Sequence, residues 1–91
     1  MLERTRRKKT TEVTFVLPPG HSAGEASVVG DFNDWQPGAH PLAPRKDGSR
    51  AVTVALPTAQ RFSFRYLADG DHWFDEIDAD GHDGRNSYLD S

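Results

Sequence analysis

The chain has 91 residues, no cysteine and a formal net charge of −3 at neutral pH. This length fits one domain that buries only about 60–65% of its unfolded surface, so we expect modest stability. The lack of cysteine excludes disulfides and a thiolate nucleophile. No apolar run approaches the ~18 residues of a membrane span, and the N-terminus lacks an apolar signal segment. We therefore expect a cytoplasmic protein that does not contact a membrane.

The charges are distributed unevenly. Residues 1–9 carry five basic residues and one acid, whereas residues 69–91 carry eight acids and one basic residue. We expect residues 1–10 to form a disordered basic arm that precedes a single domain over residues 11–91. A basic arm can also contact nucleic acid or another anionic surface, and this remains an alternative, although we do not favour nucleic acid as a partner.

Apolar residues alternate with polar ones along most of the chain, as in half-buried strands. Within residues 61–68, for example, Phe62, Phe64 and Tyr66 share one face and Arg65 lies on the other. Pro18, Pro19 and Gly20 end the first strand, and Asp69-Gly70 is a hairpin turn signal. The predicted fold is an all-β, immunoglobulin-like sandwich of about seven short antiparallel strands. The predicted strands cover residues 11–17, 25–32, 50–56, 61–68, 72–76 and 86–90.

Both tryptophans of the chain lie at predicted turns. Trp35 follows the second strand in the segment GDFNDW (residues 30–35), and Trp73 follows the hairpin turn. Each is either a lid on the core or an exposed platform. An exposed ring beside polar groups suits the apolar faces of a sugar. Arg65 on its outward face and Asn86 at the last strand could donate hydrogen bonds, or could be an ordinary surface residue and a turn residue.

Other chemistries fit the sequence less well. Residues 76–87 resemble a calcium loop at Asp78, Asp80 and Gly81, but Ser87 replaces the last acidic ligand. The four histidines have no metal-ligand spacing, and no serine lies in a nucleophile motif. A glycosidase needs a deep cleft that a domain of this size hardly supplies. We expect no metal, no cofactor and no catalysis.

Three segments taken together resemble a known family. GDFNDW, FRYLADGDHWFDE and RNSYLD are similar to motifs of the early-set glycogen-binding domains called carbohydrate-binding module family 48. Such domains occur at the N-termini of isoamylases and glycogen branching enzymes and in the β subunit of AMP-activated protein kinase. The resemblance covers roughly residues 11–90. It implies non-catalytic binding of α-1,4-glucans such as glycogen, starch or maltooligosaccharides.

The resemblance also implies roles for individual residues. Trp35 and Trp73 match the two stacking platforms, although the turn before Trp73 is one residue longer than the family's. Arg65 matches the basic residue of the hairpin strand, and Asn86 matches an asparagine that bonds sugar hydroxyls. His82 stands where the kinase subunit has a leucine, which makes it a further candidate for the site.

A second interpretation keeps the fold but not the ligand. In that case the domain is a protein-interaction module that docks onto a glycogen-metabolising enzyme or a signalling protein, with little or no sugar binding. The sequence leaves this alternative open.

Overall fold

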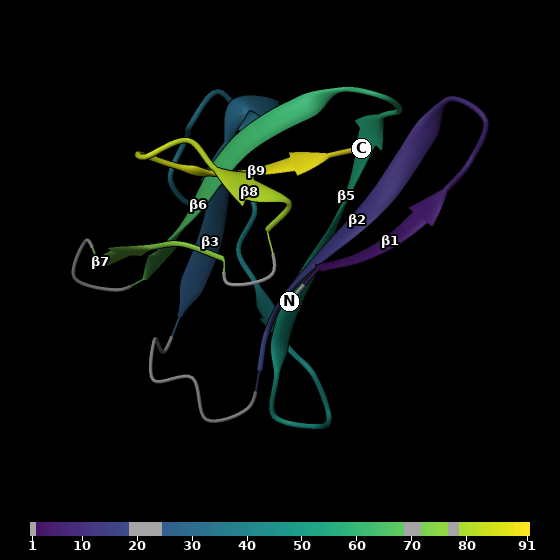
Figure 1. The fold of residues 1–91 in the computed structure, drawn as a ribbon. Helices are drawn as coiled ribbons and strands as arrows, with labels where there is room; N and C mark the ends of the chain where they lie inside the picture. The colour runs from purple at the N-terminus through teal and green to yellow at the C-terminus, as the bar shows by residue number, and fades with distance from the viewer. Residues whose placement is uncertain (1, 19–24, 69–71, 77–78) are drawn as a thin grey trace.

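The computed structural model describes residues 2–18, 25–68, 72–76 and 79–91, and these residues form two antiparallel sheets (Figure 1). The predicted all-β fold is confirmed. The described residues contain more strands than the seven predicted, because short edge segments also pair. The strands are β1 (Leu2–Arg6), β2 (Thr10–Leu17), β3 (Ala26–Gly30), β4 (Ala43–Pro44), β5 (Arg50–Pro57), β6 (Arg61–Ala68), β7 (His72–Phe74), β8 (Gly81–His82) and β9 (Ser87–Asp90).

The first sheet has the order β1-β2-β5-β4, and the second has the order β3-β6-β9-β8 with β7 paired to β6. In the second sheet β6 is the central strand, since it pairs with β3 along one edge and with both β9 and β7 along the other. The antiparallel pairing of β6 with β7 confirms the predicted hairpin. The turn residues Asp69 and Gly70 lie outside the described part of the chain, as do Pro19 and Gly20.

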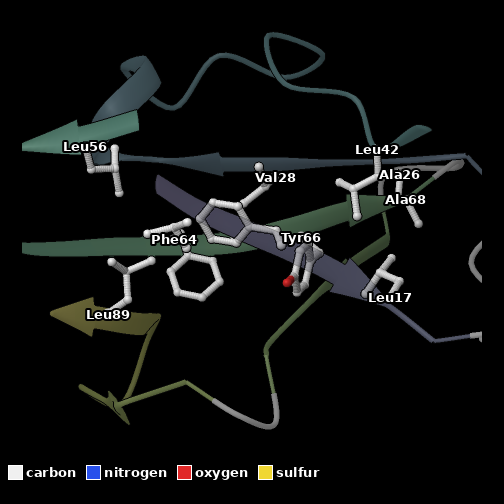
Figure 2. Packing of buried hydrophobic residues seen from close by; sticks show 11 residues of the cluster. Leu17, Ala26, Val28, Leu42, Leu56, Phe64, Tyr66, Ala68 and Leu89 are labelled. Carbon is white, nitrogen blue, oxygen red and sulfur yellow. The ribbon is translucent and has the colours of Figure 1, made fainter. Parts of the chain in front are cut away.

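The core lies between the two sheets and includes Phe64 and Tyr66, which the alternation predicts to face inward (Figure 2). Leu42, from a segment between the predicted strands, also belongs to it. Phe15 of β2 lies at the centre of the core. The centroid of the Phe15 ring is 5.2 Å from that of Phe64, 5.5 Å from that of Phe32 and 6.5 Å from that of Tyr66. All of these except Phe32 are fully buried. Edge-to-face and offset contacts of this kind add to the free energy gained from burial of the rings.

The N-terminal segment differs from the expected disordered arm. Leu2–Arg6 pair with β2 over the whole length of β1. The Arg4 guanidinium also reaches the second sheet, where it lies 2.8 Å from a carboxylate oxygen of Asp80 and donates to the carbonyl oxygen of Asp90 at 3.1 Å. Partners far along the chain therefore order this segment, and sequence composition does not reveal such partners.

Gly30 ends β3 where the backbone passes very close to β6. A Cβ atom on Gly30 would lie 2.5 Å from the carbonyl oxygen of Ser63 and 2.8 Å from the Cβ of Phe64. Its backbone is extended, with φ of −171°, so the constraint is space and not conformation. We expect Gly30→Ala to lower the free energy of unfolding by about 1–3 kcal/mol, because the strands must move apart. Urea denaturation measures this change.

Gly38 offers a matched control. It has φ of +79°, and a methyl group added there would have no atom within 4 Å, so Gly38→Ala tests backbone strain without a clash. That substitution should cost about 1 kcal/mol. An unchanged urea midpoint for Gly30→Ala would contradict the close approach of the two strands.

Candidate functional site

Two candidate residues, Arg65 and Trp73, lie on the outward face of the second sheet. Arg65 alternates with the buried residues Phe64 and Tyr66, so its side chain is on the face away from the core. Leu67 shares that face and pairs with Trp73 of β7. Directly opposed residues of an antiparallel pair lie on the same face, so Arg65 and Trp73 are neighbours there.

Trp73 is exposed. Its relative exposure is 37%, and it is the one large hydrophobic residue that is exposed in the part of the chain the structure describes. The next residue, Phe74, takes the inward position and stacks on Tyr66 with a centroid distance of 5.3 Å. The short strand β7 therefore anchors itself through Phe74 and leaves the ring of Trp73 facing solvent.

Trp35 lies in a tight turn after β3. Residues Asp31–Asn33 form one 3-10 turn, and Phe32 packs into the core. Asp34 and Trp35 then both have positive φ, 55° and 56°. Aspartate adopts this conformation readily, but it is rare for a bulky residue and costs roughly 1–2 kcal/mol at Trp35. Such strain persists only where surrounding bonds impose it, and it is common at functional sites.

Hydrogen bonds of Asn33 hold this turn closed. Its side-chain oxygen accepts from the backbone N–H of Gly30 at 3.0 Å, and its amide donates to the carbonyl oxygen of Val28 at 3.0 Å. The backbone N–H of Trp35 donates to the carbonyl oxygen of Gly30 at 3.0 Å. The predicted turn is therefore present, and the side chain of Asn33 stabilises it through two bonds to the backbone.

Asp31 connects the turn to β6. One carboxylate oxygen accepts from Nε1 of Trp35 at 2.9 Å, and the other accepts from the backbone N–H of Ser63 at 2.8 Å. Trp35 is thus held near Ser63, whereas Trp73 is opposite Leu67. Ser63 and Leu67 are four residues apart on β6, which is ~13 Å at the usual rise of a strand, with Arg65 between them.

Arg65 is held by an acid from the neighbouring strand segment. Its Nε lies 3.2 Å from a carboxylate oxygen of Asp75, and the same oxygen accepts from the hydroxyl of Ser87 at 3.2 Å. Both members of the ion pair are partly exposed, so the pair contributes little to stability. Its consequence is geometric, because it fixes one edge of the guanidinium group at the surface.

Asn86 immediately precedes β9. The register of β6 and β9 ends at Phe64 opposite Ser87, so Asn86 lies next to the end of this paired segment. Backbone N–H groups of Asn86 and Arg85 donate to the carboxylate of Asp83, at 2.8 and 2.9 Å, and hold the pKa of Asp83 below its usual value. The side-chain amide of Asn86 makes no hydrogen bond within the described residues.

His82 does not join this group. His82 pairs with Ser87, and Ser87 pairs with the buried Phe64. Paired residues share a face, so His82 belongs to the face of Phe64 and not to the outward face of Arg65. The structure thus places Arg65 and Trp73 on the outward face of the second sheet, holds Trp35 near Ser63 of β6, and separates His82 from Arg65 and Trp73.

The acidic loop shows no metal centre over the residues that the structure describes. Among them no group of three or more histidine or acidic side chains could hold a metal ion. Asp80 instead bonds Arg4 and the backbone of Asp90, and Asp78 of the calcium hypothesis lies outside the described residues. No helix in the described part of the chain has the length and hydropathy to cross a membrane.

Sequence reasoning missed the acids that hold the site. The sequence indicates only turn or surface positions for Asp31 and Asp75, although each bonds a candidate ligand residue. Their signal is weak because a surface acid within a few residues of a tryptophan or arginine is common. Glu76 was also missed: it is buried and accepts from the hydroxyl of Tyr66 at 2.8 Å.

The fold and this face define a small all-β protein of two antiparallel sheets, one of which presents an exposed aromatic ring beside a guanidinium group. No family model matches the chain. Over 68 residues it is 31% identical to the 1,4-alpha-glucan branching enzyme GlgB of Aquifex aeolicus (strain VF5).

The match covers most of this chain but little of the enzyme. The matched region makes up 71% of this chain but only 11% of the enzyme. The chain is therefore similar to a small part of a glucan branching enzyme.

Proposed function

We propose that the chain is a non-catalytic module that binds α-1,4-glucans. The observation that carries the proposal is the exposed ring of Trp73 on β7, which lies opposite Leu67 and next to Arg65 on the outward face of the sheet. Trp35, at the other end of the same strand segment, supplies the second ring. Similarity to part of a glucan branching enzyme supports the same class of ligand.

The proposed roles follow from the chemistry of each group. Indole rings stack on the apolar faces of glucose units, while the guanidinium of Arg65 and the amide of Asn86 donate to hydroxyl oxygens. Arg65 uses Nε for Asp75, so its two terminal nitrogens, which make no hydrogen bond within the described residues, are the donors for the sugar. Two rings and a few exposed hydrogen bonds give weak binding, about micromolar to millimolar.

Titration with maltoheptaose tests the proposal. We expect a change in tryptophan emission and chemical-shift changes of both indole N–H signals at micromolar to millimolar sugar. The neutral ligand should bind almost equally at low and high salt. A β-1,4-linked oligosaccharide of equal length is the control and should bind much more weakly. If neither the emission nor the chemical shifts change at millimolar maltoheptaose, the proposal is wrong.

The same exposed ring also suits a protein partner, since tryptophan is frequent at the centre of protein interfaces. Under this alternative the module docks onto a glycogen-metabolising enzyme or a signalling protein. Capture from lysate before and after digestion of glycogen separates the two candidates: partners retained after digestion favour protein docking, and partners lost with the glycogen favour the glucan.

A further inference from the structure

We propose that Asp31 is a positioning residue that fixes the ring of Trp35 for ligand binding. The inference rests on the proposed function and adds to it a residue that does not touch the sugar. Asp31 is exposed and lies four residues before Trp35, yet both of its carboxylate oxygens are in use. One binds the ring and the other binds the backbone of the central strand.

The two bonds together make a rigid connection. The 2.8 Å bond to the N–H of Ser63 prevents rotation of the carboxylate, because Ser63 is within the paired part of β6. The 2.9 Å bond to Nε1 of Trp35 then transfers this fixed position to the indole. Hydrogen bonds to an ionised acceptor are about twice as strong as neutral ones, so an exposed bond of this kind can hold a side chain.

The geometry of the bond suits a stacking ring. An indole N–H group lies in the plane of the ring, so Asp31 fixes the orientation of Trp35 from its edge and covers neither face. The backbone of Trp35 has φ of 56°, a conformation that favours a small flexible residue and not a large ring. We infer that the turn tolerates this strain because the position of the ring is required.

Loss of the connection should weaken binding without removing the ring. A free side chain loses its rotational freedom when a ligand immobilises it, and this loss corresponds to about two- to tenfold in affinity. We therefore expect Asp31→Ala to bind maltoheptaose about two- to tenfold more weakly than the unchanged protein. Asp34→Asn is the matched control, since it removes a charge from the same turn and tolerates positive φ.

Hydrogen exchange of the two indole N–H groups tests positioning without any sugar. In Asp31→Ala we expect the Nε1 proton of Trp35 to exchange at least about tenfold faster, because its acceptor is gone, while that of Trp73 does not change. Asp34→Asn should change neither signal. An unchanged exchange rate for Trp35 in folded Asp31→Ala would overturn the proposal.

A double-mutant cycle separates positioning from a general effect on the fold. Trp35→Phe removes the N–H donor and keeps the bond between Asp31 and Ser63. If Asp31 acts through the indole, adding Asp31→Ala to Trp35→Phe should weaken binding by less than about twofold. Equal weakening in both backgrounds would overturn the proposal. If the unchanged protein binds no glucan, the proposed function fails, and the exchange measurement still decides whether Asp31 holds the ring.

Discussion

Trp73→Ala is expected to weaken maltoheptaose binding at least about tenfold, and Trp35→Ala should do the same. Each substitution removes a stacking ring, and truncation of a central aromatic residue typically costs about 2 kcal/mol or more at a binding site. Trp73 is exposed, so its loss leaves the core intact. Isothermal titration calorimetry measures the affinity, and circular dichroism verifies the fold of each variant.

Two further variants make this test specific. Trp73→Phe retains an aromatic face and should lose less affinity than Trp73→Ala. Thr5→Ala alters the exposed surface of the other sheet and should leave the affinity unchanged. Full binding by both alanine variants at the tryptophans would exclude the outward face of β6 as the glucan site. Weakening by only one of them would show that the ligand contacts a single ring.

Phe15→Ala is expected to lower the free energy of unfolding by about 3–5 kcal/mol. Phe15 is fully buried, and its ring contacts those of Phe32, Phe64 and Tyr66. Its removal leaves a cavity at the centre of a small core. A domain of this size has a free energy of unfolding of about 5–15 kcal/mol, so this substitution removes a large part of it. Urea denaturation followed by circular dichroism gives the change.

Phe15→Leu separates the cavity from the aromatic contacts. Leucine fills part of the space and should cost less than alanine, about 1–2 kcal/mol. Thr5→Ala, at the surface of the neighbouring strand β1, should stay within about 0.5 kcal/mol. A loss below about 1 kcal/mol for Phe15→Ala would show that the two sheets do not pack around this ring.

The alternation of apolar and polar residues was sufficient to predict the positions of most of the strands. β6 covers residues 61–68 as predicted, and β2, β3, β5 and β9 lie within two residues of the predicted ranges. The reason is physical. Side chains of a strand alternate between faces, so a strand with one buried face shows apolar and polar residues in alternation along its sequence. The same pattern placed Arg65 outward and Phe64 inward, as the structure has them.

Pairing between distant segments could not be predicted from the sequence. Leu2–Arg6 have a composition typical of a solvated arm, yet they form β1 because β2 and the pair Asp80 and Asp90 provide partners. His82 lies close to Asn86 in the sequence but belongs to the other face of the sheet, because the register with Ser87 decides its side. A shift of one residue in that register would reverse the result.

The sequence by itself determined an all-β chain, the inward and outward residues of its main strands and two tryptophans at turns. Only the tertiary structure decided that Trp35 and Trp73 lie at opposite ends of one strand segment and that Asp31 and Asp75 hold Trp35 and Arg65. Within a long strand, local alternation encodes which face a side chain takes, since successive residues point to opposite faces. Contacts between strands depend on register and closure of the sheets, which many residues far apart determine together.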